Sequence, residues 1–331
     1  MKLDKKDFQI LKILADNCRT PTGHVAKQIG MSRESTHYRI QRLLEKNVIT
    51  KFSISVDIQK LGFLQHIIYL SLQRVDNLDE ITQKIVENPL VGWTTKTPGK
   101  WDLIFDVYTQ DMTQLDEFLS NFKKEMKHLI SDIEISTQLE IKTYPSKYFG
   151  KTDSKKQKIP QKAKVDKAIL KPKDLELLKL LSTNARLDLR AISKKIDISF
   201  PTLKKRMALL EESGIIMNYT LLFDQEKVGI RRFYPHFNIN CDLLEEEGKF
   251  IKFLQTHTNV SSYIRPSAQP SIRVGVFANN HLEFRKIMTD IRKKFGHMFK
   301  LDRVVIVHAE PKSKIVPEGI FPLLAKEMKF N

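Results

Sequence analysis

Cysteine and long apolar runs are scarce in this sequence. The only two cysteines among 331 residues, Cys18 and Cys241, stand far apart and form no CxxC pair. This excludes a disulfide framework and fits a reducing compartment. No stretch approaches the roughly 18 consecutive apolar residues that a membrane helix requires. Acidic residues occupy the place where a secretory signal has its apolar core, so we expect a cytoplasmic protein that does not bind membranes.

Motifs of enzyme chemistry are missing as well. The chain has no P-loop, no GxGxxG and no GxSxG pattern, and its nine histidines show no pair with metal-ligand spacing. We therefore expect no metal, no cofactor and no catalytic residue.

Basic residues are abundant and unevenly distributed. The chain has 56 Lys and Arg against 39 Asp and Glu, a net charge of +17, which favours a polyanionic partner such as double-stranded DNA. The net charge is +6 over residues 1–62, −5 over 63–144, +8 over 145–173, +1 over 174–229 and +7 over 230–331. The first part of the chain is therefore polarised: residues 1–62 are suited to meet an anion, whereas residues 63–144 are not.

The chain repeats itself at a constant offset of 167 residues. Residues 7–62 align without a gap on residues 174–229, with 16 identities in 56 positions, Arg19 and Arg186 among them. This match indicates two copies of one arrangement. Between them, residues 145–173 contain ten Lys and only two acids, which predicts a flexible linker. The alternative is a basic arm that becomes ordered on DNA.

The start of each copy has the pattern of a winged helix-turn-helix. Apolar residues recur at helical spacing from Phe8 to Leu14, and a second short helix ends at Gly30. Ser32 is placed to cap a third helix, and residues 52–56 alternate like a wing strand. The third helix of such a motif enters the major groove, so its unburied residues near the N-terminus are expected to contact DNA.

The residues of that helix that lie outside its buried apolar stripe are the candidate DNA-binding residues. In the first copy they are Arg33, Glu34, Ser35, His37, Tyr38, Arg39 and Arg42. In the second copy they are Thr202, Lys204, Lys205 and Arg206. The first set suits base edges, whereas the second suits phosphates and thymine methyl groups. Solvated helix surfaces with no DNA contact are the alternative for both sets.

After Gly62 the pattern changes to strands and helices in the order βαββαβ, which is ferredoxin-like and makes the fold class α+β. We expect one face of each sheet to be apolar and to pack on the other sheet. The predicted elements of the first copy are strands at 63–72, 91–97, 103–108 and 133–143, and helices at 78–87 and 113–128.

These features resemble two fused copies of the Lrp/AsnC (feast-or-famine) family of transcription regulators. The resemblance rests on Asp7, Arg19, the stretches 26–32 and 38–43, and the turn at 98–103, whose residues are Pro-Gly-Lys-Trp-Asp-Leu. It implies a winged helix-turn-helix at 1–62 and a ligand-sensing, oligomerising domain at 63–144. The same pair then follows at 174–229 and 230–331, the latter including a C-terminal tail without an assigned role.

The resemblance also implies a site for a small, amino-acid-like effector at Gly99, Trp101 and Asp102. The alternative is that Gly99 only forms the turn and that Asp102 is bonded locally. The aligned turn of the second copy, near residues 268–271, lacks both the glycine and the acid.

Two further possibilities remain open at the level of sequence. Siroheme decarboxylases share this architecture, and Arg231, Arg232 and His236 would suit their polyanionic substrate. Within the regulator interpretation, the two copies are expected to pair as an intramolecular pseudo-dimer, with higher homo-oligomers also possible. The alternative is that each copy pairs with its like in another chain.

Overall fold

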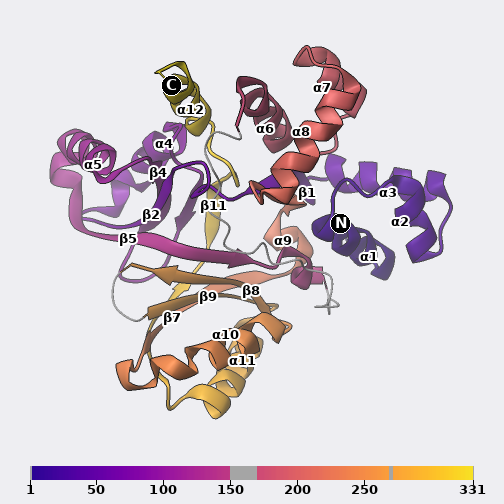
Figure 1. Ribbon diagram of the computed structural model, residues 1–331. Coiled ribbons are helices and arrows are strands. Elements are labelled where there is room, and N and C mark those ends of the chain that lie inside the picture. Colours follow the sequence, from indigo (N-terminus) through magenta and orange to yellow (C-terminus); the bar gives the residue numbers. More distant parts are fainter. Residues whose placement is uncertain (1, 150–169, 268–270, 331) are drawn as a thin grey trace. The chain divides into compact units, whose positions relative to one another are not determined.

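The computed structural model describes residues 2–149, 170–267 and 271–330 (Figure 1). The chain divides into two compact units, each built from both copies. The first contains residues 2–63, 170–224 and 313–330, and the second contains 64–149, 225–267 and 271–312. The expected linker therefore falls largely, at 150–169, outside the described residues. The first five residues of the expected linker, 145–149, form a 3-10 helix.

The first copy of the helix-turn-helix consists of α1 (Lys5–Asp16), α2 (Thr22–Ile29), α3 (Arg33–Glu45) and strand β1 (Ile49–Val56). Local chemistry sets its boundaries. Gly30 ends α2 in the left-handed conformation, with φ of +64°, as a helix C-terminus commonly requires. The Ser32 side chain accepts a hydrogen bond from Ser35 N, 3.1 Å away, and thereby caps α3.

The second copy repeats these elements as α6 (Pro172–Thr183), α7 (Leu189–Lys195), α8 (Phe200–Glu212) and β6 (Ile216–Phe223). Ser199 caps α8 as Ser32 caps α3. The repeat therefore has the same fold in both copies, as its gap-free alignment predicts.

Strands β1 and β6 pair with each other, antiparallel, and form a two-stranded sheet shared by the two copies. Ser53 lies opposite its own repeat equivalent, Thr220. The hydrogen bonds on either side obey the same symmetry: Ser53 Oγ donates to Ser182 O at 3.0 Å, and Thr220 Oγ1 donates to Ala15 O at 3.1 Å. The strand that we expected to form a wing therefore pairs with its equivalent in the other copy, and a pseudo-twofold axis relates the two strands.

Two equivalent arginines reinforce this pairing. Arg19 donates from Nη1 to Ala185 O at 2.5 Å, and its guanidinium lies 5.7 Å from the Tyr219 ring centroid. Arg186 reciprocates with the carbonyls of Cys18 and Thr20. Each arginine thus satisfies backbone carbonyls of the other copy, which explains its repetition at an offset of 167 in the sequence.

The second unit contains both βαββαβ arrangements, as expected from the sequence. The first is β2 (Leu64–Leu72), α4 (Leu78–Glu87), β3 (Trp93–Lys96), β4 (Leu103–Thr109), α5 (Met112–Met126) and β5 (Ile130–Thr143). A short helix, α9 (Gln225–Val228), precedes the second, which is β7 (Arg231–Ile239), α10 (Glu247–Thr256), β8 (Val260–Pro266), β9 (Ser271–Ala278), α11 (His281–Phe295) and β10 (Phe299–Ile306).

The strands of both arrangements form one nine-stranded sheet in the order β10-β7-β9-β8-β5-β2-β4-β3-β11. The copies meet where the long strand β5 pairs antiparallel with β8. Strand β11 (Ala309–Ser313), from the second copy, pairs in turn with β3 of the first. Each copy therefore contributes one strand that pairs with a strand of the other copy.

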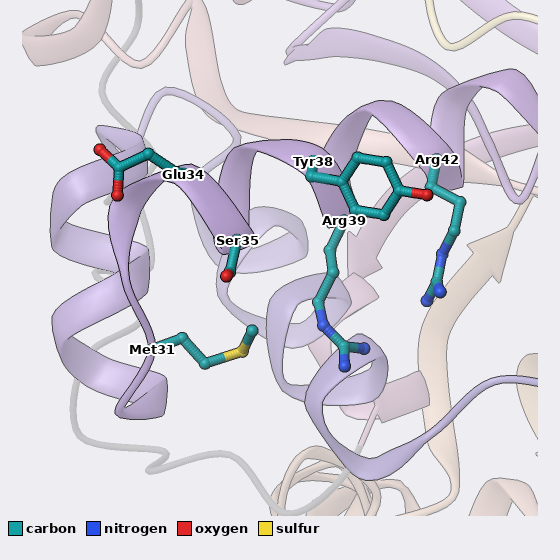
Figure 2. A pocket seen from close by; sticks show the side chains of 6 residues that line it. All are labelled: Met31, Glu34, Ser35, Tyr38, Arg39 and Arg42. Carbon is teal, nitrogen blue, oxygen red and sulfur yellow. The ribbon is translucent and has the colours of Figure 1, made fainter.

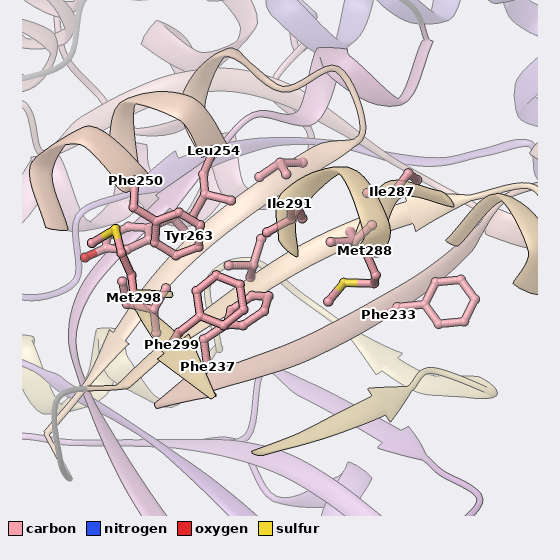
Figure 3. Packing of buried hydrophobic residues seen from close by; sticks show 14 of the residues in the cluster. Phe233, Phe237, Phe250, Leu254, Tyr263, Ile287, Met288, Ile291, Met298 and Phe299 are labelled. Carbon is pink, nitrogen blue, oxygen red and sulfur yellow. The ribbon is translucent and has the colours of Figure 1, made fainter. Parts of the chain in front are cut away.

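Each arrangement has its own hydrophobic core beneath its helices. In the second copy, Phe233 and Phe237 from β7 pack with Phe250 from α10 and with Ile287 and Ile291 from α11 (Figure 3). In the first copy, Ile68, Phe105 and Leu115 belong to the matching cluster. These cores account for one face of each half of the sheet.

The opposite faces of the two halves of the sheet meet one another and differ in polarity. In β7 the residues that alternate with Phe233 and Phe237 are Arg232, Tyr234, His236 and Asn238. The apolar cluster between the faces consists of Ile67, Tyr69, Trp101, Ile104 and Val305. The expectation of an apolar inner face holds for β2, whose Ile67 and Tyr69 lie in this cluster, but was wrong for β7. Phe233, Phe237 and Ile239 of β7 turn toward the helices, which leaves polar side chains between the two halves of the sheet, in what we call the inter-sheet layer.

The C-terminal tail, which the sequence left without a role, has two parts. In the second unit, β11 extends the sheet, and Lys312 donates to the carbonyls of Val86 and Asn88 at the end of α4. Lys147 caps α10 in the same way through Gln255 O and His257 O. In the first unit, α12 (Ile320–Phe330) packs against α6, with Ile320, Phe321 and Leu324 buried.

We expect the two copies to stay together after the chain between them is cut. A protease site inserted between residues 150 and 169 would separate the copies covalently, yet the pairs β1–β6, β5–β8 and β3–β11 all join them. Light scattering after cleavage should give the mass of a one-to-one pair, and urea should release the fragments. Separate homodimers of each half would contradict the pseudo-dimer.

Candidate DNA-binding surface and inter-sheet layer

Helix α3 carries a row of exposed side chains, three of which, Glu34, Ser35 and Tyr38, are drawn in Figure 2. Tyr38 is 67% exposed, and Arg33, Glu34, Ser35 and His37 are also exposed. Thr36, Ile40 and Leu43 are buried and hold the helix against its domain. The five exposed residues therefore form the only part of the first predicted set that is free of contacts within the domain's interior. Their contact with DNA remains a prediction.

Arg39 and Arg42 form ion pairs within the domain, and their predicted contact with DNA stays a prediction. Arg39 Nη1 lies 2.9 Å from Asp7 Oδ1 and 2.8 Å from Asp4 Oδ2, and Arg42 Nη2 lies 2.9 Å from Asp7 Oδ2. Asp7 is fully buried. Because a buried carboxylate without its cationic partners is strongly destabilising, these arginines serve to fix α3 on α1.

Arg206 is engaged in the same way in the second copy. Its Nε donates to Asp174 Oδ1 at 2.8 Å, and Asp174 is 1% exposed. Asp7 and Asp174 are repeat equivalents, so the ion pair is a shared structural feature of both domains. Arg206 therefore has a structural role within the domain, and its predicted contact with DNA stays a prediction.

The remaining candidates of α8 are exposed but differ chemically from those of α3. Lys204 and Lys205 are exposed, and Lys204 Nζ lies 4.9 Å from the Phe200 ring centroid. The Thr202 hydroxyl is 2.7 Å from the hydroxyl of the capping residue Ser199. This surface offers cationic contacts and an aromatic ring, and the first turn of α8 contains no Asn, Gln or Glu.

The turn before β4 does not gather its three candidate residues around one point. Gly99 adopts a φ of +129°, which favours glycine, and no atom lies near the position of a Cβ there. The Asp102 carboxylate accepts a hydrogen bond from Leu72 N at 2.7 Å, so it is locally bonded. Trp101 instead enters the layer between the sheets and is 4% exposed. In the second copy, residues 268–270 of the aligned turn lie outside the described residues.

Polar side chains fill the centre of the inter-sheet layer. Tyr69 and its repeat equivalent His236 face each other edge-on, with ring centroids 6.0 Å apart. Arg273 donates from Nη1 to Tyr69 Oη at 2.5 Å and from Nη2 to Gln138 Oε1. Burial, and then the positive charges of Arg273 and Arg303, hold the pKa of His236 well below its usual range. The imidazole is therefore neutral at physiological pH.

A second polar group of this layer is centred on Asp106, which is 2% exposed. Its Oδ1 accepts from Gly92 N at 2.8 Å and Trp93 N at 2.6 Å, and its Oδ2 accepts from Gln65 Nε2 at 2.8 Å and Tyr108 Oη at 3.0 Å. Burial raises the pKa of Asp106 to about 6, although these hydrogen bonds oppose the rise. The carboxylate fixes the chain where it enters β3.

The comparisons with known proteins agree with the repeat. A family model described as winged helix-turn-helix DNA-binding matches residues 3–50 and again residues 170–217. The HTH-type transcriptional regulator FL11 of Pyrococcus horikoshii is 27% identical over 117 residues, which are 35% of this chain and 78% of that protein. An uncharacterized HTH-type transcriptional regulator of Pyrococcus abyssi is 28% identical over 144 residues, 43% of this chain and 97% of its own length.

Both copies of the chain are similar to regulators of the Lrp/AsnC type. Among solved structures, that of AsnC from E. coli is similar over 42% of this chain and 94% of its own, with 25% identity and a TM-score of 0.39. The structure of the siroheme decarboxylase NirDL aligns over its whole length with 98% of this chain, with a TM-score of 0.63 and 12% sequence identity. At that identity the likeness shows a shared fold.

No helix among the described residues is long and apolar enough to cross a membrane. No group of three or more His, Cys, Asp or Glu side chains in the same part of the chain is arranged to hold a metal ion.

The polar inter-sheet layer is the feature that sequence reasoning missed. The signal was the alternation of Arg232, Tyr234 and His236 with phenylalanines in a single strand, which indicates two different environments on its two faces. Arg231 and Arg232 had been considered only with His236, as parts of a substrate site. In the structure Arg231 is exposed, whereas Arg232 lies 3.3 Å from Glu310 in an ion pair.

The raised pKa of Asp106 predicts a pH dependence of stability. A carboxyl group with a folded-state pKa of about 6 and an unfolded value near 3.9 stabilises the fold at low pH, and this contribution is lost as the pH rises through 6. Asp106→Asn should therefore remove up to about 3 kcal/mol of pH-dependent stability between pH 4 and 7.

Thermal unfolding of both proteins across that range measures the effect. The exposed Asp116 on α5 supplies the matched control, Asp116→Asn, which should keep the wild-type profile. Parallel profiles of wild type and Asp106→Asn would show that Asp106 does not titrate in this window.

Proposed function

We propose that the chain is a sequence-specific, DNA-binding transcription regulator of the cytoplasm, with residues 1–62 as its principal reading domain. The observation that carries this proposal is the exposed surface of α3, where Arg33, Glu34 and His37 stand free on the helix expected to enter the major groove. The two family matches and the charge of +6 support it. The domain divisions at 62, 144, 173 and 229 are part of the same proposal.

The two reading helices have unequal roles in this proposal. Helix α3 offers Arg, Glu, Ser and His to base edges, whereas α8 offers Thr202, Lys204 and Lys205, which suit phosphates. Because the pseudo-twofold pairing holds one helix of each kind, the DNA site should be an imperfect palindrome with one strong half. Half-sites are expected about one turn, or about 34 Å, apart.

We also infer that a small amino-acid-like effector regulates DNA binding through the turn at Gly99, Trp101 and Asp102. The support is the resemblance of this turn to that of the family, together with the φ of Gly99. The regulator is thus an allosteric binding protein in which the second unit senses and the first unit reads. Higher homo-oligomers of the pseudo-dimer belong to the same proposal.

Arg33→Ala and Lys204→Ala should have different effects on DNA binding. A lost base contact costs about 1 to 3 kcal/mol on the specific site only, whereas a lost phosphate contact weakens all DNA alike and lowers the salt slope by about 0.9. A site is first selected from random fragments. Fluorescence anisotropy at several salt concentrations then gives affinities for selected and scrambled DNA.

Arg33→Ala should lower the ratio of the two affinities by about tenfold, and Lys204→Ala should leave it unchanged. Equal changes in that ratio would contradict the unequal roles of the helices. The exposed Arg285 on α11 provides a charge-matched control, since Arg285→Ala should alter neither affinity nor salt slope.

An amino-acid effector should stabilise the folded chain by mass action, and the effect should depend on Asp102. Thermal shift across the common amino acids should find a stabiliser that Asp102→Ala abolishes and Ser271→Ala leaves intact. Asp102→Asn keeps an acceptor for Leu72 N and so separates loss of charge from loss of the turn. A ligand that still stabilises Asp102→Ala would refute the site.

A further inference from the structure

Buried nitrogen atoms without partners gather around Tyr69 in the inter-sheet layer. Among the described residues, Arg273 Nε, Trp101 Nε1 and His236 Nε2 are buried and have no hydrogen-bond partner. All three belong to side chains that contact Tyr69: Arg273 through its hydroxyl, and the rings of Trp101 and His236 at centroid distances of 5.8 and 6.0 Å. Three unsatisfied polar atoms around one residue are unusual in a folded core.

Arg273 also has an unbalanced charge. It is 6% exposed, and its partners in the described part of the chain, Tyr69 and Gln138, are both neutral. The neighbouring Arg303 is already engaged by both carboxylate oxygens of Glu134, at 2.9 and 3.0 Å. A buried charge requires an opposite charge and hydrogen bonds to be tolerated. The Arg273 guanidinium has the hydrogen bonds but lacks the anion.

We propose that the nitrogens around Tyr69 bind the carboxylate group of a small anionic ligand in the inter-sheet layer. Arg273 Nε–H and Trp101 Nε1–H donate to its oxygens, and His236 adds a third donor in the tautomer protonated at Nε2. Water would satisfy these donors but would leave the charge of Arg273 unbalanced, so an anion fits better than water. The inference rests on the proposed effector response, for which it supplies the ligand's chemical class and place.

The two tryptophans of the chain provide the readout. Trp101 and Trp93 each give one indole N–H signal in a nitrogen-15 NMR spectrum of the full chain, and Trp101→Phe assigns them. Trp93 Nε1 already donates to Glu310, so its signal serves as an internal reference. Acetate is added at constant ionic strength and without DNA, and acetamide is the neutral probe of the same shape.

Acetate should shift the Trp101 signal in a saturable manner, and acetamide should not. Arg273→Gln should weaken this binding at least tenfold. Arg265→Gln, on the neighbouring strand β8, removes an arginine that is paired with Glu247 and should change nothing. If Arg273→Gln fails to fold, His236→Phe is expected to weaken acetate binding and tests the same site.

Three outcomes would overturn the proposal: an equal shift by acetamide, an equal shift by chloride, or full acetate binding in the folded Arg273→Gln protein. The turn is tested separately: Asp102 is expected to act on the rest of an amino acid and not on its carboxylate, so Asp102→Ala should abolish the amino-acid response and retain the acetate response. Since no DNA is present, a failure of the DNA-binding proposal leaves these results unaffected.

Discussion

Strand pairing between the two copies is the constraint on which the rest of the structure depends. Strand β1 has no partner within its own helix-turn-helix and pairs instead with β6, about the Ser53–Thr220 position. Strands β5 and β11 likewise complete the sheet of the other copy. Because unpaired backbone groups at a strand edge are costly when buried, each copy is incomplete by itself. The pairing of β1 with β6 is symmetric, whereas the exposed surfaces of helices α3 and α8 differ in their side chains.

Elements set by local chemistry were predictable from the sequence. Gly30 and Ser32 mark the ends of α2 and α3, and the helix at 78–87 matches α4 residue for residue. Pairing between copies was only partly predictable, because an offset of 167 identifies equivalent residues without saying which strand meets which. The exchange of β5 and β11 depends on contacts between residues more than 100 positions apart, and no local pattern encodes it.

The candidate DNA-binding residues show a similar division. Amphipathic spacing correctly separated Thr36, Ile40 and Leu43 from the exposed face of α3. It could not reveal that Arg39 and Arg42 pair with Asp7, which lies 32 and 35 positions away. A long, charged side chain at a half-buried helical position can pair within the domain, reach outward or do both, and spacing alone does not reveal the pairing. The inner face of β7 was misjudged because alternation does not say which face meets the helices.

The exchange of strands between copies also affects how the chain is made. The ribosome completes β1 at residue 56 but reaches the end of its partner β6 only at residue 223. At about 5 to 20 residues per second, the first copy waits roughly 10 to 30 s with open strand edges. During that time it can pair with another nascent chain on the same message. Fusion of the two copies therefore makes the correct partner the nearest one, at the expense of a delay that separate subunits do not have.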